Sequence, residues 1–108
     1  MIKICIKPLS VNEAFQGRKF KTPKYKAYEK HTLLLLPSKI TLPPPPYRID
    51  FEFGLSSSLS DWDNPIKPTQ DIICKKYGIN DKLISEGNVK KIKVKKGEEY
   101  FRFKIDSA

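Results

Sequence analysis

Four stretches of the chain alternate between apolar and polar side chains, which is the period of a β-strand with one buried face. They cover residues 1–7, 47–53, 90–96 and 100–105. Between the last two stretches, Lys96-Gly97-Glu98 has the composition of a tight turn. The pattern therefore predicts four strands, the last two joined as a hairpin.

Two other stretches have the spacing and the end signals of helices. Thr22-Pro23 is typical of an N-cap followed by a first helical position, and apolar residues at helical spacing then predict a helix over residues 23–36. Asp63-Asn64-Pro65 offers a cap and a helix start again, and Gly78 offers a stop. A second helix is predicted over residues 65–77.

The resulting order, β-α-β-α-β-β, indicates an α+β fold in which a small mixed sheet packs against two helices. Residues 9–21 show no regular period, and Pro43–Pro46 predicts an extended connection, with docking to a proline-recognition domain as the alternative. A chain of 108 residues has room for one core. We therefore expect one domain over residues 1–108, and its small size favours a homodimer.

Composition excludes several classes of protein. The longest apolar run, Leu33–Leu36, is too short to cross a bilayer, and the charged first residues do not resemble a signal peptide, so we expect a soluble, cytoplasmic protein. Cys5 and Cys74 form no paired motif, and we expect two buried thiols. His31 is the only histidine and the glycines are scattered, which argues against a zinc site and a phosphate-cradling loop.

The net charge of +9 is unevenly distributed along the chain. Residues 1–48 carry ten basic and two acidic side chains, residues 49–86 carry four and seven, and residues 87–108 carry seven and three. Basic flanks attract polyanions such as nucleic acid. An acidic centre in such a protein indicates either a metal between carboxylates and phosphate, or acids that cap helices and pair with lysines.

The acidic centre contains a spaced set of side chains. Asp61 and Asp63 are two residues apart, so both carboxylates can face one cation from an extended segment. Asp63, Lys67 and Asp71 are spaced four residues apart. If the helix begins near residue 64, all three side chains share one helix face. This arrangement suits phosphodiester hydrolysis with Mg²⁺, but Asp-x-Asp is also common in turns and caps, and Lys67 with Asp71 is equally an exposed ion pair.

Several segments together resemble the RusA-type Holliday-junction resolvases. The central segment, Asp61-Trp62-Asp63-Asn64-Pro65-Ile66-Lys67 with Asn80-Asp81 beyond it, is similar to the family pattern Asp-x-Asp-Asn-x-x-Lys followed by a further Asp. Pro8-Leu9-Ser10-Val11-Asn12, Lys24-Tyr25-Lys26-Ala27-Tyr28 and Lys95-Lys96-Gly97-Glu98 resemble other parts of the family. The likeness extends over nearly the whole chain.

The resemblance implies a homodimer that cuts branched DNA, above all four-way junctions, with Mg²⁺ or Mn²⁺ and no small-molecule cofactor. Such enzymes are common in phages and prophages. Asp61, Asp63 and Asp81 match the metal-binding acids, and Lys67 matches the essential lysine; these four are the expected catalytic residues. Asn64 and Asp71 are expected to support them.

The basic side chains are candidates for contacts with the DNA backbone. They are Arg18, Lys19, Lys21, Lys90, Lys91, Lys93, Lys95 and Lys96. Trp62 is expected to pack in the core or in a dimer interface, with stacking on a base as the alternative. The competing function is a non-catalytic, basic nucleic-acid-binding module with the same fold.

Overall fold

The computed structural model of the chain describes residues 1–16, 20–57 and 62–108. Arg18, Lys19 and Asp61, which the sequence singles out, lie outside these described residues. The elements follow in the order β1 (Ile2–Ile4), α1 (Val11–Ala14), β2 (Phe15–Gln16), β3 (Phe20–Lys21), α2 (Pro23–Leu35), β4 (Tyr47–Leu55), α3 (Ile66–Tyr77), the 3-10 helix η1 (Asp81–Leu83), β5 (Ile84–Lys93) and β6 (Tyr100–Ser107).

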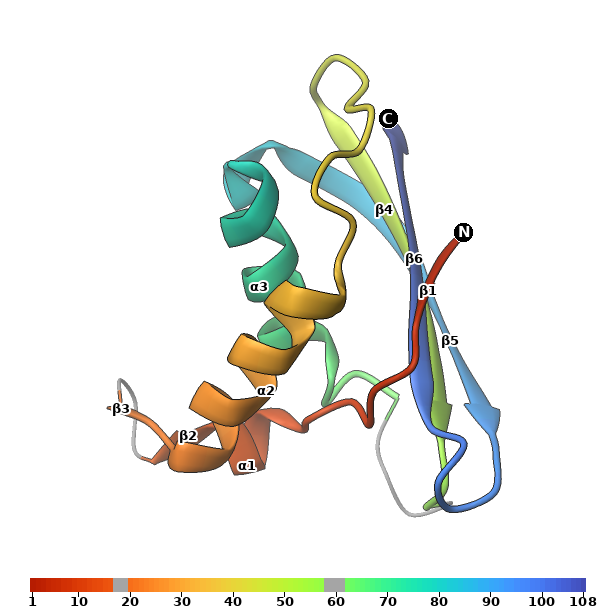
Figure 1. Ribbon diagram of the computed structural model, residues 1–108. Coiled ribbons are helices and arrows are strands. Elements are labelled where there is room, and N and C mark those ends of the chain that lie inside the picture. The colour runs from red at the N-terminus through yellow and green to blue at the C-terminus, as the bar shows by residue number, and fades with distance from the viewer. Residues whose placement is uncertain (17–19, 58–61) are drawn as a thin grey trace.

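Four of the strands form one mixed sheet with the order β1-β6-β4-β5. Strand β6 runs antiparallel to both β1 and β4, whereas β5 runs parallel to β4. Helices α2 and α3 lie on one face of this sheet, and no helix covers the other face in the part of the chain that is described (Figure 1). The expectation of an α+β fold with a mixed sheet is confirmed.

The predicted hairpin between the last two strands is wrong. Strand β4 lies between β5 and β6, so these two strands are not neighbours although the turn at Gly97 joins them in sequence. The reason is burial: β4 is buried along its whole core face and needs a neighbour on each side, and β6 brings Phe101 and Phe103 into the core. Strand β5, which carries lysines and is mostly exposed, takes the edge of the sheet.

The two main helices begin and end close to the predicted residues. Thr22 caps α2, because its Oγ1 accepts a hydrogen bond from the amide of Tyr25, and Gly78 ends α3 in the left-handed conformation at φ 66°. Helix α3 begins at Ile66, and its N-cap residue Pro65 has no side-chain cap. Asp63 therefore neither caps α3 nor lies on the helix, which corrects the predicted face shared by Asp63, Lys67 and Asp71.

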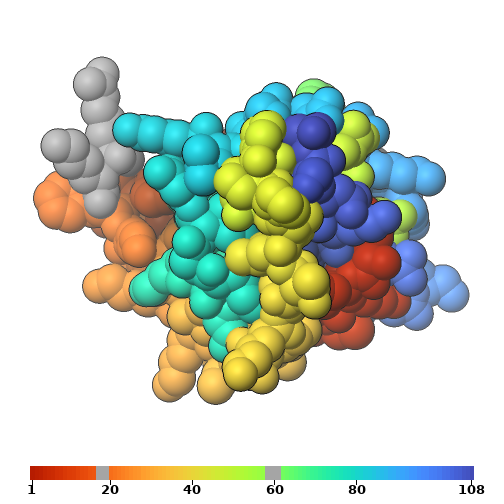
Figure 2. Space-filling model, turned by 90° about the horizontal axis from the view of Figure 1, so that it is seen from above, coloured from red at the N-terminus to blue at the C-terminus, as the bar shows by residue number. Residues whose placement is uncertain are grey.

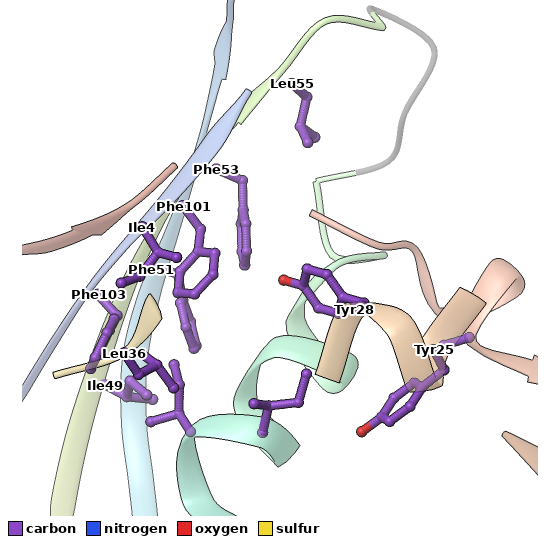
Figure 3. Packing of buried hydrophobic residues seen from close by; sticks show 13 residues of the cluster. Ile4, Tyr25, Tyr28, Leu36, Ile49, Phe51, Phe53, Leu55, Phe101 and Phe103 are labelled. Carbon is purple, nitrogen blue, oxygen red and sulfur yellow. The ribbon is translucent and has the colours of Figure 1, made fainter. Parts of the chain in front are cut away.

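The core lies between the sheet and the two helices (Figure 3). Phe51, Phe53, Phe101 and Phe103 come from the two central strands, and Tyr28 faces them from α2. The hydroxyl groups of Tyr28 and Thr69 lie 2.8 Å apart and form a buried hydrogen bond between α2 and α3. Apolar packing and this buried polar contact together fix α3, the helix that carries Lys67 and Asp71.

Residues 9–21, for which no regular structure was expected, contain the one-turn helix α1 and a two-stranded ribbon of β2 and β3. Ser10 starts α1 with its side chain accepting a hydrogen bond from the amide of Glu13. Such short elements escape periodicity because they span one turn or two residues. Figure 1 shows the ribbon projecting at the end of the molecule away from the sheet.

The proline-rich connection between α2 and β4 is bonded to the rest of the molecule. The carbonyl oxygen of Pro37 accepts a hydrogen bond of 2.7 Å from the Tyr77 hydroxyl, and that of Pro44 accepts one of 3.0 Å from Ser107. In Figure 2 this yellow segment lies between α3 and the carboxyl-terminal strand. The chain bends at residues 44–46 before β4 begins, however, so the prediction of an extended run over Pro43–Pro46 is wrong.

Two predictions about burial need correction. Cys74 is buried on α3, but Cys5, which directly follows the last residue of β1, is exposed. Trp62 is 57% exposed, so it does not pack in the core, while packing in a dimer interface stays a prediction. Within residues 1–16, 20–57 and 62–108, no helix has both the length and the apolar character that a membrane span requires.

Candidate functional site

The turn at residues 62–65 places Asp63 ahead of α3. The carbonyl oxygen of Asp63 accepts a hydrogen bond of 3.1 Å from the amide of Ile66, and that of Asn64 accepts one of 2.8 Å from the amide of Val11. Asn64 therefore supports the turn through its backbone and joins it to the first residue of α1. The Asp63 side chain is exposed and has no ion-pair partner among the described residues.

Lys67 and Asp71 lie one turn apart on α3. Their Nζ and Oδ2 atoms are 3.3 Å apart, and the side chains are 64% and 32% exposed, respectively. This is the ion pair that the i+4 spacing allowed. Lys67 lies four residues beyond Asp63 in sequence, and its side chain is exposed to solvent. Because Asp71 is already paired with a lysine, it suits a supporting role better than that of a metal ligand.

Asp81 lies beyond the carboxyl end of α3, at the start of η1. Asn80 starts this element, since its side chain accepts a hydrogen bond of 3.0 Å from the amide of Lys82. The Asp81 side chain lines a groove between α3 and β5, together with Ile66 and Gln70. Gln70 is a groove residue that was not among the predicted site residues, although Gln70-Asp71 belongs to the segment that resembles the family and Gln70 has i+4 spacing from Ile66.

Besides its burial, the pKa of the Cys74 thiol is affected by one acid on α3 and by one beyond the carboxyl end of that helix. Burial raises its pKa to about 11, and the negative charges of Asp81 and Asp71 add to this effect. Asp71 and Asp81 therefore both lie within electrostatic reach of Cys74. Asp63, by contrast, precedes the first residue of the helix.

The donor set for a metal ion consists of carboxylates. Asp63 and Asp81 are exposed and carry no ion pair in the described ranges, so their oxygens are available to a hard cation such as Mg²⁺ or Mn²⁺. Residues 1–16, 20–57 and 62–108 contain no group of three His, Cys, Asp or Glu side chains placed to hold a metal. The third expected ligand, Asp61, lies outside those ranges.

The lysines of β5 divide between the two faces of the sheet. Lys90 is paired in register with Glu52, on the face that no described helix covers. Lys91 and Lys93 are paired with the buried residues Phe53 and Leu55 and therefore lie on the same face as α2 and α3. Lys93 also donates a hydrogen bond to the carbonyl oxygen of Ser56, at the end of β4.

Opposite charges are paired across the open face of the sheet. Arg48 lies 3.1 Å from Asp50, Arg102 lies 3.6 Å from Glu52, and Lys104 lies 3.5 Å from Asp106. Three such pairs neutralise much of the positive charge that the sequence places on these strands. The open face is therefore a weaker candidate for a DNA-binding surface than the total charge suggests.

A less balanced basic surface lies where β5 ends. Lys93, Lys95 and Lys96 line a hollow beside Ser56, and Glu98 is the one acidic residue among the described lining residues. Neither Lys95 nor Lys96 has an ion pair within the described part of the chain. Lys21, another predicted DNA contact, is instead paired with Glu29 at 3.5 Å.

Glu99 connects the turn at Gly97 to Ser56, the residue that follows β4. One of its carboxylate oxygens accepts a hydrogen bond of 2.7 Å from the amide of Gly97, and the other accepts one of 2.8 Å from the hydroxyl of Ser56. Backbone and Ser56 hydrogen bonds lower the pKa of Glu99. No local pattern predicts this contact, because it joins residues 43 positions apart.

Comparisons with family models and with curated proteins identify no family for the chain. No protein-family model matches the chain, and no curated protein matches it either.

Proposed function

We propose that the chain is a metal-dependent, structure-specific endodeoxyribonuclease of the RusA type, which hydrolyses phosphodiester bonds in branched DNA such as four-way junctions. The observation that carries the proposal is the placement of Asp63 and Lys67. Both are exposed on either side of the start of α3, and the turn between them is bonded to the amino-terminal segment through Asn64 and Val11. The segments that resemble the family are thus in direct contact.

In this proposal Asp61, Asp63 and Asp81 hold Mg²⁺, with Mn²⁺ as a substitute. When bound, such an ion polarises the phosphate and acidifies an attacking water. Lys67 neutralises the charge that develops on the phosphoryl oxygens or on the leaving oxygen. Asp71 holds the Lys67 ammonium near the start of α3, and Lys95 and Lys96 contact the DNA backbone.

A homodimer is part of the proposal, because a four-way junction has two equivalent strands to cut. Among the described residues, β5 lies at an edge of the sheet with a strand on only one side, so a second copy has backbone groups available for pairing there. The mass in solution tests this directly. A dimer has twice the chain mass of 12.5 kDa in analytical ultracentrifugation, and a monomer at working concentrations would contradict this part of the proposal.

The cleavage assay compares a synthetic four-way junction with a linear duplex of equal length in Mg²⁺, Mn²⁺ and EDTA. We expect symmetric nicks in the junction alone, and only with metal. Asp63→Asn should abolish cleavage while junction binding stays equal or tightens, because a negative charge near phosphate is removed. Asp106→Asn, on the open face beside Lys104, is the matched control. Cleavage by Asp63→Asn at the normal rate would overturn the assignment.

A second function is a non-catalytic module that binds DNA or RNA, because the basic surface of Lys93, Lys95 and Lys96 would serve binding without cleavage equally well. Such a module would bind the junction tightly and cut it under no metal condition. Absence of binding to any nucleic acid would exclude both functions.

A further inference from the structure

Trp62 is the only tryptophan of the chain, and its indole is 57% exposed. It directly precedes Asp63, at the start of the turn that leads into α3. A tryptophan of a small domain normally buries most of its large apolar surface. No ring contact or cation–π contact holds Trp62 within the described part of the chain. Its position points to a ligand with an apolar face.

The backbone that carries this indole is fixed on its carboxyl side. The next two residues each accept a backbone hydrogen bond, Asp63 from Ile66 and Asn64 from Val11. Pro65, which follows them, is buried, and α3 begins immediately after it. The turn is therefore a firm support, and a side chain on a firm support loses little conformational freedom on binding.

The chemistry of the ligand follows from the position of the indole. Lys67 lies five residues beyond Trp62 and is a candidate phosphate contact, so a nucleotide strand at this site would bring a base near the indole. Aromatic side chains stack well on nucleobases. In an unbroken duplex both faces of each base are already covered by the neighbouring base pairs. At a branch point, bases can unstack and offer a free face.

We propose that Trp62 stacks on an unstacked nucleobase next to the phosphate contacted by Lys67, and thereby makes the chain prefer branched DNA over linear duplex. The inference rests on the proposed function, because it takes the phosphate site from it. It adds a specificity-determining residue to that site. Trp62 selects the shape of the substrate, whereas the acids and Lys67 act on the phosphate.

The single tryptophan makes a direct test possible. The intrinsic fluorescence of the 108-residue chain is recorded in EDTA, which prevents cleavage. The protein is titrated with a four-way junction, a linear duplex of the same sequence and a single-stranded oligonucleotide. Labelled-DNA anisotropy shows when each complex is saturated. We expect strong quenching by the junction and the single strand, and little by the duplex at saturation.

Two substitutions complete the test. Trp62→Ala should lower the ratio of junction to duplex affinity by about tenfold, whereas Trp62→Phe should retain most of it, because a smaller ring still stacks. Leu34→Ala removes an apolar side chain that is 75% exposed on α2 and serves as the control. Circular dichroism of each variant shows whether the fold is retained.

The outcomes separate this inference from the proposed function. Equal quenching by saturating duplex, or an unchanged affinity ratio in Trp62→Ala, would overturn the role of Trp62 even if the protein cuts junctions with metal. A buried-type emission spectrum in DNA-free protein that becomes exposed-type on dilution would show that a second copy covers the indole. Junction-specific quenching without metal-dependent cleavage would support Trp62 and refute the nuclease.

Discussion

The amide of Val11 donates a hydrogen bond of 2.8 Å to the carbonyl oxygen of Asn64. This contact joins the start of α1 to the turn that carries Trp62 and Asp63, and it connects two motifs far apart in the sequence. The hollow next to it is lined by Pro8, Ser10, Asn64 and Pro65. The amino-terminal segment therefore acts as a support for the candidate site.

Removing the Val11 donor should loosen the turn. Val11→Pro deletes this amide hydrogen while suiting the first position of α1, since Ser10 before it is already extended at φ −76° and ψ 154°. We expect a loss of about 1 kcal/mol in unfolding free energy, measured by urea denaturation, and slower junction cleavage. Val11→Ala keeps the amide and should cleave faster than Val11→Pro. Equal behaviour of the two variants would show that the hydrogen bond does not support the site.

The Lys67–Asp71 pair allows the catalytic role of Lys67 to be separated from its structural role. Both side chains are at least partly exposed, so breaking the pair should change the unfolding free energy by no more than about 0.5 kcal/mol. Lys67→Ala should slow junction cleavage about 100-fold, in line with the loss of one group that stabilises transition-state charge. Asp71→Asn should slow it far less, because Lys67 keeps its charge. A similar loss in both variants would assign the effect to the pair as a unit.

The lysines on β5 and those just beyond its end are expected to affect DNA binding differently. Lys95 and Lys96 line the hollow beside Ser56, whereas Lys90 lies on the open face opposite Glu52. We expect the double variant Lys95→Gln with Lys96→Gln to reduce the slope of log affinity against log salt by about one to two units, since each lost phosphate contact removes about 0.9. Lys90→Gln should leave the slope unchanged. An equal reduction by Lys90→Gln would place the DNA on the open face.

Local signals were sufficient for the main elements. The Thr22 cap, the Gly78 stop and the alternation from residue 47 to residue 53 depend on neighbours in the sequence, and the structure shows α2, α3 and β4 at nearly the predicted residues. The prediction of a hairpin between β5 and β6 was wrong for a non-local reason. The position of β5 at the edge depends on how much apolar surface β4 and β6 bury against each other, and no turn motif encodes that.

The same reasoning from local sequence predicted only part of the candidate site. Spacing predicted the Lys67–Asp71 contact, because residues four apart on a helix are neighbours. Spacing could not predict the exposure of Trp62 or the hydrogen bond that Ser56 donates to Glu99. Both depend on how distant segments meet. The alternation of β5 does divide its lysines into two sets, but only the sheet order shows which set shares a face with α3.

The two cysteines should differ strongly in their reaction with a thiol reagent. Only the thiolate reacts, and burial raises the pKa of Cys74 from 9.0 to about 11, so its thiolate fraction at pH 8 falls about 100-fold. Cys5 is exposed. We expect one thiol to react rapidly with an aromatic disulfide at pH 8, and Cys5→Ser to remove that phase. Above pH 9, the reaction of Cys74 should still accelerate about tenfold per unit until its pKa is reached, whereas two fast phases at pH 8 would show that α3 opens readily.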